Sequence, residues 1–276
     1  MTCGTLDKDR ITDPKMWNLL LRIGMRDLHI AAYSIVEENS MIYRHFLLDS
    51  NPDKFLRSLE DVIYDNPMFL SDFRRIYCVV QTQSLLVIPS EYNHESDREE
   101  IFKAANPEFE GHIMFEQTGT RNASIVAGVG NDLMGFIRRT FHNAVVCSHL
   151  SSLTRFFSAK AGKGNNMKML ANLRESSVDV IIMQGGTLMQ ANTFSFSDPM
   201  DAVYYLLACR HRIGLDPHND ELLLAGDSAI REKIITVLRN YLARVMPAIF
   251  PPQMFKSGKD AMLVPFDLIV TPLLCE

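Results

Sequence analysis

Two segments of this chain, about 150 residues apart, predict the same succession of structural elements. In each segment, short apolar runs predict a β-hairpin that ends at a polar residue followed by proline, at Asn51-Pro52 and at Asp198-Pro199. A capping side chain before a proline marks the start of a helix, and each segment continues as a helix and then a further strand. Hairpin-then-helix units are common in α+β proteins, so the pattern leaves open whether the two halves are copies of one unit.

Apolar periodicity also predicts the elements between and around these two segments. In the first half we expect strands over 28–35 and 41–48, a β-rich stretch over 76–88, strands over 113–117 and 123–128, and helices from 52, over 97–105 and over 131–141. In the second half we expect strands over 144–147, 169–173, 178–183, 188–196 and 222–225, and helices over 150–159, 200–212 and 228–242. This order predicts an N-terminal segment over 1–26 with short helical character, a first domain over 27–142 and a second over 143–276, with a flexible junction at 161–166.

The composition is that of a compact globular protein and excludes several classes of partner. Of the 276 residues, 47% are hydrophobic and 22% are charged, which is enough to bury a substantial core. The net charge is −5 and no long run of lysine or arginine occurs, so we expect no nucleic-acid partner. No apolar run approaches the roughly 18 residues of a membrane helix, and the first residues lack the apolar core of a signal peptide. We therefore expect a cytoplasmic protein without membrane insertion.

The five cysteines, at positions 3, 78, 147, 209 and 275, are too far apart in the sequence to form a metal knuckle. An odd number of scattered cysteines does not predict a disulfide framework. Cys78, Cys147 and Cys209 lie in apolar runs, where a free thiol packs as a small hydrophobic group. The sequence thus predicts a reduced protein.

Two glycine turns are the candidate ligand-binding features of the second half. The apolar run 222–225 ends at Gly226, and Asp227 and Ser228 then open a helix. Glycine frees the backbone to turn, and the unpaired N–H groups at a helix start favour an anion. An earlier segment, Ile182-Met183-Gln184-Gly185-Gly186-Thr187, has the form of a second phosphate-binding turn.

The repeated element order and these turns make the chain similar to the actin-like ATPase superfamily, which also contains the sugar kinases. In that superfamily, two ribonuclease-H-like domains face each other across a nucleotide cleft. Each domain contributes a hairpin loop that holds phosphate, and a later Gly-Gly turn holds adenosine. The segment 182–187 is similar to the second phosphate loop, usually Asp-x-Gly-Gly-Gly-Thr, and 224–228 is similar to the adenosine turn.

This resemblance implies an α/β fold with mixed sheets, built from two ribonuclease-H-like domains related by internal duplication. It also implies a candidate degenerate nucleotide cleft, formed by Gly185, Gly186, Thr187, Gly226, Asp227 and Ser228.

Three further segments make the chain similar to a narrower family. They are Asn192-Thr193-Phe194, then Asp201 with Tyr204-Tyr205-Leu206, and the ending Pro265-Phe266-Asp267-Leu268. Over residues 27–276 the chain resembles a Bacteroidetes domain of unknown function with an actin-like fold, which implies a bacterial protein. Because that family carries no assigned activity, the resemblance bears on the fold more than on the function.

The residues that perform phosphoryl transfer in the superfamily are replaced here. The metal-orienting aspartate of the second phosphate loop falls on Ile182, and one of its three glycines falls on Gln184. The first phosphate loop, usually Asp-x-Gly-Thr/Ser, falls on residues 28–34, which contain neither the acid nor the glycine, and Tyr33 would crowd a phosphate. In the adenosine turn, Asp227 stands beside one glycine where two are usual. Because phosphoryl transfer depends on positioning and on metal electrostatics, we expect no catalytic residues, no metal site and no ATPase activity; bound ATP with magnesium is possible but disfavoured.

Several other patterns have a structural interpretation as well as a functional one. Two carboxylates and a histidine in 216–220 fit a solvated turn better than a cation site. Residues 128–135 resemble a dinucleotide loop whose third glycine comes too late, which favours a tight turn with Asn131 as the helix cap. His142, Cys147 and His149 are near in sequence, but a strand over 144–147 would send alternate side chains to opposite faces. The apolar, proline-rich segment 245–255 is either a packed crossover to a strand near 262–264 or an exposed interaction surface.

Three functional hypotheses follow from the sequence. The first is a pseudoenzyme, an inactive actin-like protein that acts as a scaffold or assembly component with a protein partner, as superfamily members do in secretion and pilus systems. The second is a nucleotide-binding ATPase or kinase-like enzyme with degenerate phosphate loops. The third is a small-molecule or peptide sensor that uses the interdomain cleft. The partner and the oligomeric state are left open.

Overall fold

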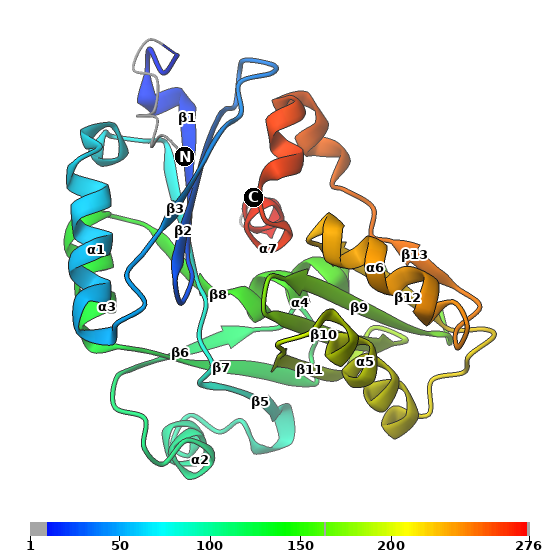
Figure 1. The fold of residues 1–276 in the computed structure, drawn as a ribbon. Helices are drawn as coiled ribbons and strands as arrows, with labels where there is room; N and C mark the ends of the chain where they lie inside the picture. The colour runs from blue at the N-terminus through cyan, green and yellow to red at the C-terminus, as the bar shows by residue number, and fades with distance from the viewer. Residues whose placement is uncertain (1–9, 163, 275–276) are drawn as a thin grey trace.

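Two five-stranded sheets face each other and carry helices on their outer sides, as Figure 1 shows. This architecture is that of a computed structural model, which describes residues 10–162 and 164–274. Three residues discussed above lie outside the described residues, namely the cysteines Cys3 and Cys275 and, in the predicted junction, Lys163. Within the described ranges, no helix has the length and apolar character needed to cross a membrane.

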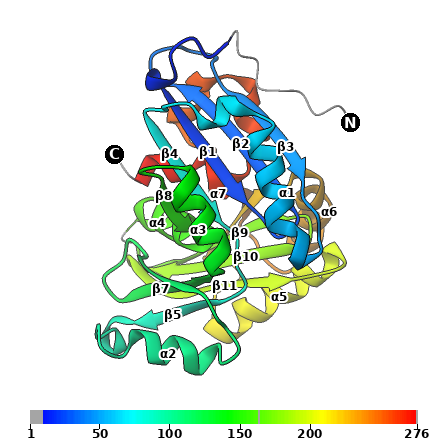
Figure 2. The same cartoon turned by 90° about the vertical axis from the view of Figure 1, so that its left-hand side faces the viewer.

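The first sheet and its helices come from the first half of the chain. They are β1 (Trp17–Ile23), β2 (Asp27–Ser34), β3 (Ile42–Leu47), α1 (Pro52–Tyr64), β4 (Arg75–Val80), α3 (Asn131–Thr140) and β8 (Val145–Ser148). The strand order is β3-β2-β1-β4-β8; β1, β2 and β3 are antiparallel, and β4 and β8 run parallel to β1. Figure 2 shows α1 and α3 covering the outer face of this sheet.

The second sheet repeats this pattern. It contains β9 (Met167–Arg174), β10 (Ser177–Gln184), β11 (Thr187–Ser195), β12 (Glu221–Gly226) and β13 (Val245–Pro247), with α5 (Pro199–Ile213) and α6 (Ser228–Leu238) on its outer face. The order β11-β10-β9-β12-β13 has the same succession of antiparallel and parallel neighbours as the first sheet. The predicted repetition of element order is therefore present, while its origin in a duplication stays a prediction.

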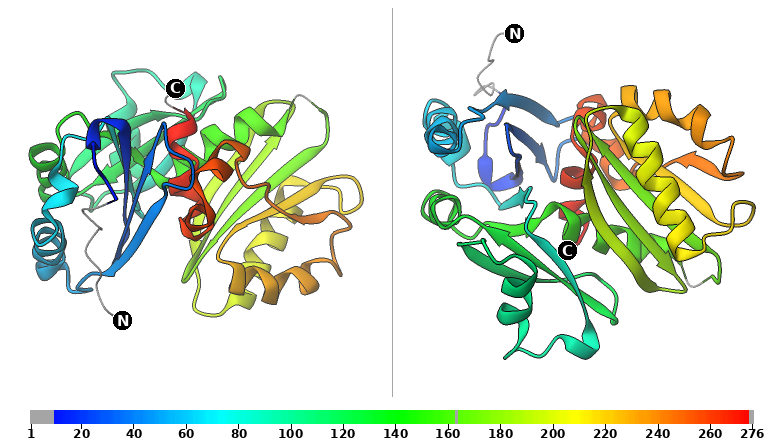
Figure 3. Two further views of the ribbon diagram at one scale, coloured as in Figure 1. Left: turned by 90° about the horizontal axis from the view of Figure 1, so that it is seen from above. Right: turned by 60° about the horizontal axis from the view of Figure 1, so that its bottom comes forward.

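The part of the chain that connects β4 to β8 forms a third sheet, which lies to one side of the two main sheets (Figure 3, right). It consists of β5 (Leu85–Pro89), β6 (His112–Gln117) and β7 (Ala123–Val129) in the order β5-β7-β6, with α2 (Arg98–Ala105) packed on it. The predicted stretch 76–88 is thus two strands of different sheets rather than one unit.

Alternation along the strands gives each main sheet two different faces. In β1, Leu19 and Leu21 belong to the core under α1 and α3, whereas Leu20 belongs to the core between the two sheets. Asn18 and Arg22 lie two residues before and after Leu20, on the same face of β1. Both are polar and both are buried. The inner faces of the sheets therefore enclose polar groups as well as apolar ones.

The space between the sheets is filled by the chain itself. α4 (His149–Ala161), which follows β8, and α7 (Phe266–Ile269), near the C-terminus, lie between the two sheets in Figure 1 and in the left view of Figure 3. Leu153 of α4 and Leu268 of α7 are fully buried in the core that both sheets share. α7 contacts β1, β12 and α4, so elements from both ends of the chain meet there.

The N-terminal prediction was wrong in one respect. Residues 1–26 were expected to be a segment with short helical character, but within its described part, residues 10–26, only Pro14–Met16 is helical, as a single 3-10 turn, and 17–23 is the central strand β1. The reason is that every residue of this strand is buried, including the polar Asn18 and Arg22, so its sequence shows neither alternation nor an unbroken apolar run. As a result, residues 28–34 are the interior of strand β2 and not a loop. β1 and β8 lie on the first sheet although both fall outside 27–142; the division of the chain into two domains stays a prediction.

The C-terminal prediction was also partly wrong. α6 ends at Leu238 rather than Leu242, and residues 262–264 are not a strand, because 259–263 forms a 3-10 helix. The segment 245–255 begins as β13 and then crosses to the first sheet, where Ser257 O accepts a hydrogen bond from Met41 N at 2.8 Å. Val245, Pro251 and Met254 are buried, whereas Met246 and Ile249 are 40% and 79% exposed, so the segment is partly packed and partly in solvent.

Candidate functional site

The turn at Gly185 and Gly186 has a local structural reason. Both residues have positive φ, 58° and 83°, and they form the two-residue connection between β10 and β11. A two-residue hairpin turn with both φ values positive favours glycine at these places, whatever it binds. Leu188 N and O on β11 are hydrogen-bonded to the Asn122 side chain, at 3.0 and 2.8 Å, so the turn packs beside the third sheet.

Gly226 and Asp227 also have local reasons. Gly226 has a φ of 83°, and a Cβ at this position would lie 2.0 Å from Leu173 O on β9. Asp227 N donates to the same carbonyl at 2.8 Å, and the Asp227 side chain caps α6 by accepting from Ile230 N at 2.9 Å. The carboxylate therefore occupies one of the N–H groups at the helix start, and its negative charge opposes binding of a further anion there. Ser228 is the first residue of that helix.

The two turns do not line one cleft. Gln184, at the end of β10, pairs with Met167, whereas Gly226 pairs with Leu173 at the other end of β9. Six residues of a strand span about 20 Å, so the turn before Thr187 and the turn before Ser228 lie beside opposite ends of β9. Ile182 lies inside β10 and is fully buried. The candidate set Gly185, Gly186, Thr187, Gly226, Asp227 and Ser228 is thus separated into two groups.

Tyr33, which was expected to crowd a phosphate, is engaged elsewhere. Its hydroxyl accepts a hydrogen bond from Asn18 Nδ2 at 2.8 Å, within the inner face of the first sheet. It also lines a hollow of about 300 Å³ between the β2–β3 hairpin and the C-terminal crossover. Its role in the described structure is therefore to pack the inner face.

Exchanging Gly226 for alanine should destabilise the protein by about 2–3 kcal/mol, because the new Cβ meets the Leu173 carbonyl and the backbone is held in a left-handed conformation. Gly185→Asn is the matched control, since that turn is open and asparagine tolerates positive φ, so a change within about 0.5 kcal/mol is expected. Urea unfolding of both variants measures the difference. Equal losses would show that the approach to Leu173 is relaxed in solution.

The most unusual feature of the space between the sheets is a buried carboxylate shared by two arginines. Asp267 on α7 is fully buried; Arg22 on β1 and Arg174 on β9 are 4% and 9% exposed. Arg22 Nε donates to Asp267 Oδ2 at 2.9 Å, and Arg174 Nη1 lies 3.8 Å from the same oxygen. One carboxylate from the C-terminal segment therefore joins the equivalent first strands of both sheets.

A second buried carboxylate, Asp179 on β10, extends this cluster. Arg174 Nη2 and Thr193 Oγ1 donate to Asp179 Oδ1 at 2.7 and 2.8 Å, and Asn172 Nδ2 donates to Oδ2 at 3.0 Å. His149, at the start of α4, places Nε2 3.3 Å from Asp179 Oδ1. Burial alone would raise the pKa of Asp179, but the charges of Arg174 and His149 and the hydrogen bonds hold that pKa well below its usual range.

This cluster is partly unsatisfied. Among the described residues, Asp267 Oδ1 and Asn172 Oδ1 accept no hydrogen bond, and Arg174 Nη1 donates none. Burial tends to lower the pKa of Arg22, but the charges of Asp267, Asp27 and Asp179 raise it above the ordinary arginine value. A positively charged guanidinium on each side of an ionised carboxylate makes an electrostatic clamp between the sheets rather than an acid–base pair.

At the edge of the same space lies a group that could hold a metal ion. Asp27, His29 and His45 lie on β2 and β3, and their ligand atoms are all within 4.8 Å of one another. Arg22 Nη1 is 4.0 Å from Asp27 Oδ2, which joins this group to the clamp. Among the described residues this is the one cluster of three or more such side chains with metal-compatible spacing.

The sequence analysis missed these residues, although a signal was present. Arg22 and Asp179 are single charged residues inside otherwise apolar strands, Leu19–Ile23 and Val178–Met183. A charge inside a continuous apolar run must be paired when the strand is buried. His149 was noted for its nearness to Cys147, but its partner is Asp179, 30 residues further on.

The other candidates from the sequence are structural. In the 216–220 turn, the Asp216 and Asp220 carboxylates accept from the backbone N–H groups of His218, Asp216 and Met167. Asp220 is buried, so the predicted turn is present but only partly solvated. The capping prediction for Asn131 was wrong by one residue, because Gly130 is the N-cap of α3 and makes no side-chain hydrogen bond there.

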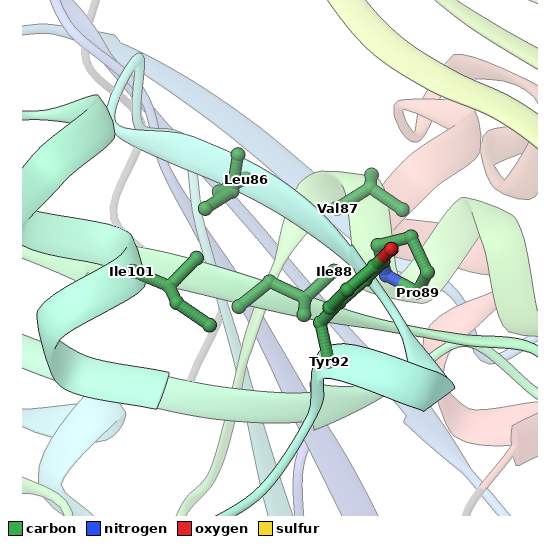
Figure 4. A pocket seen from close by; sticks show the side chains of 6 residues that line it. All are labelled: Leu86, Val87, Ile88, Pro89, Tyr92 and Ile101. Atoms are coloured by element: carbon green, nitrogen blue, oxygen red, sulfur yellow. The ribbon is translucent and has the colours of Figure 1, made fainter. Parts of the chain in front are cut away.

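A shallow apolar hollow of about 310 Å³ lies beside β5 (Figure 4). Its lining is Leu86, Val87, Ile88 and Pro89 of β5, with Tyr92 and Ile101 from the segment that leads into α2 and from α2 itself. Five of these six side chains are hydrocarbon and the sixth is a phenol, so the hollow lacks the groups for acid–base or phosphoryl chemistry.

Comparison with known proteins identifies the family. Residues 7–245 match the family described as "Protein of unknown function (DUF3822)", and the chain belongs to that family. A crystal structure from Bacteroides thetaiotaomicron, described as a protein with actin-like ATPase fold and unknown function, is similar at a TM-score of 0.74 and 22% identity, over 89% of this chain and 94% of that one. A "PilM-PilN type IV pilus biogenesis complex" is similar at a TM-score of 0.55 and 11% identity, over 92% and 98%. No curated protein matches the sequence.

These likenesses confirm two of the predictions. The chain is a member of a family of unknown function, and its fold is the actin-like ATPase fold with mixed sheets. At 22% and 11% identity the likeness concerns the fold and not the activity.

Proposed function

We propose that this DUF3822 protein is a catalytically inactive member of the actin-like fold, which serves as an assembly component for a protein partner. The contact of Asp267 with Arg22 and Arg174 is the observation that carries the proposal. It fills, with the chain's own side chains, the space between two sheets that holds nucleotide in the superfamily.

The hairpin ends of the two sheets support this proposal. In the superfamily, each domain contributes a hairpin loop to phosphate, with a metal-orienting acid. Here the first strand of each sheet ends near an arginine, Arg22 in β1 and Arg174 in β9. Both guanidiniums are neutralised by Asp267 and neighbouring carboxylates, so neither is free to bind phosphate or to replace a magnesium-binding acid.

We also infer that the chain consists of two domains that arose by internal duplication, each built on one main sheet. The common strand order of the two sheets supports this inference. The third sheet is then an insertion in the first domain.

A role in assembly is supported by the fold neighbour that was solved as a pilus biogenesis complex, and not by any contact in this chain. A cytoplasmic location is supported by Cys78 and Cys209, which are buried thiols outside any disulfide. Burial raises the pKa of the Cys78 thiol to about 12, so it packs as a neutral group. The proposed partner is a protein rather than a nucleic acid, in keeping with the net charge of −5.

Nucleotide binding tests the proposal. For the EDTA-treated full-length protein in millimolar ATP and magnesium, we expect an unchanged Tm and no phosphate release above the buffer blank. A ligand at 100 times its Kd would stabilise the fold by about 2.7 kcal/mol, so specific binding would be easily visible. Saturable stabilisation by ATP, absent with inorganic tripolyphosphate, would contradict the proposal and support the nucleotide-binding alternative.

A further inference from the structure

We propose that Asp27, His29 and His45 form a binding site for a zinc ion. His29 Nε2 is 3.0 Å and His45 Nε2 is 3.8 Å from Asp27 Oδ2. Donors that bind one Zn²⁺ at about 2.0–2.2 Å in a tetrahedron lie about 3.5 Å apart. The ligand atoms lie within 4.8 Å of one another, somewhat wider than this spacing, so binding requires the two stacked imidazole rings to tilt until their lone pairs meet at the ion.

The two strands hold these side chains in place. Asp27 and His29 are two residues apart on β2, so they point to the same face of the sheet. His45 lies directly opposite His29 in the antiparallel pairing of β2 and β3. The two imidazole rings are stacked, with centroids 4.3 Å apart and an interplanar angle of 10°. Ligands on paired strands are positioned with little conformational freedom, which lowers the entropy cost of binding.

Tyr43 supplies the outer hydrogen bond that metal-binding histidines usually make. Its hydroxyl is 2.7 Å from His29 Nδ1. The hydroxyl and Nδ1 can hydrogen-bond in either direction, and the tautomer in which the phenol accepts from Nδ1–H leaves the lone pair of Nε2 for a metal ion. Nε2 lies 3.0 Å from Asp27 Oδ2, so in that tautomer the two atoms are neighbouring ligands of one ion.

Access and ligand chemistry also suit zinc. The His45 side chain is 42% exposed, which gives the ion a path from solvent. Two imidazoles and one carboxylate favour zinc over magnesium, which prefers oxygen ligands.

Three protein ligands leave one place open on a tetrahedral ion, for water or another donor. Arg22 Nη1, 4.0 Å from Asp27, is balanced by Asp267 and does not leave a free positive charge at the site.

Metal titration tests the site, and it does not depend on the proposed function. The full-length chain carrying Cys3→Ser and Cys275→Ser is stripped with EDTA and titrated with Zn²⁺ by calorimetry and with Co²⁺ by absorption spectroscopy. We expect one equivalent of each metal, and a Co²⁺ spectrum of a four-coordinate site without sulfur-to-metal charge transfer. His45→Ala should weaken zinc binding by at least about 100-fold, and Tyr43→Phe, which removes an outer hydrogen bond, by about 10-fold.

Matched variants separate this site from chance binding. His142→Ala removes an exposed histidine outside the site and should leave the zinc affinity unchanged. The metal-free Tm of His45→Ala should equal that of the parent, because the side chain is half-exposed. Three results would each overturn the proposal. They are less than one equivalent of bound zinc, a zinc affinity that His45→Ala leaves unchanged, and the absorption spectrum of six-coordinate Co²⁺. All of these measurements are made without nucleotide.

Discussion

Replacing Asp267 by alanine is expected to destabilise the protein by about 3–5 kcal/mol, because it leaves two buried guanidiniums without their shared carboxylate. Arg22 and Arg174 are only 4% and 9% exposed, so neither can recover its hydration without opening the space between the sheets. Urea unfolding at neutral pH gives the free energy. The single tryptophan, Trp17 on β1, is buried and reports the transition by its fluorescence.

Hydrogen exchange distinguishes a local from a global effect of this substitution. Amides of 266–274 should lose protection first, while α1 and α5 on the outer faces keep theirs, because the carboxylate holds the C-terminal segment between the sheets. Asp260→Ala, an exposed acid on the same segment, is the matched control and should change the stability by no more than about 0.5 kcal/mol. If Asp267→Ala lowered the free energy of unfolding no more than the control does, water would have to solvate both arginines.

Most strands and helices could be predicted because their signals are local. Asn51 and Asp198 were read as helix caps, and their side chains do accept from Asp53 N at 3.0 Å and from Met200 N at 2.7 Å. The hairpins β2–β3 and β10–β11 follow apolar runs separated by polar turns. These features depend on residues a few positions apart, which a sequence shows directly.

The first strand of the first sheet could not be predicted, because its sequence signals conflict. The central strand 17–23 contains Asn18 and Arg22 and follows Asp13-Pro14, a helix-start signal, so its neighbour β2 was taken for the first hairpin loop. In the second half, the corresponding strand was predicted over 169–173 and is β9, and Gly185-Gly186 joins the next two strands, β10 and β11. The hairpins that begin each sheet are β1–β2 and β9–β10.

The clamp was beyond sequence reasoning for a different reason. Arg22 and Asp267 are 245 residues apart, and only the packing of α7 between the sheets brings them together. A buried charge in an apolar strand predicts that a partner exists, but not which residue it is. The zinc ligands share this property in part, since Asp27 and His29 are close in sequence while His45 depends on the register of the hairpin.

Replacing Asp179 by alanine should cost about 3–5 kcal/mol at neutral pH, since the change leaves His149 and Arg174 in a buried site without their anion. The effect should depend on pH in a definite direction. The pKa of Asp179 in the folded protein lies below that of the unfolded chain, which is about 3.9. Its contribution is therefore fully present above that value and is lost as the pH falls toward the folded-state pKa. The difference between the parent and Asp179→Ala should narrow steadily below about pH 4.

Urea unfolding of the two proteins across an acid series measures this narrowing. Asp61→Ala, an exposed acid on α1, is the matched control, and its difference from the parent should stay small at every pH because solvent already stabilises its charge. If the difference in unfolding free energy between the parent and Asp179→Ala stays constant down to strongly acid pH, the electrostatic explanation is wrong. The lost stability would then be due to packing. A narrowing gap would instead show that an ionised carboxylate on β10, held by Arg174 and His149, fixes the second sheet to α4.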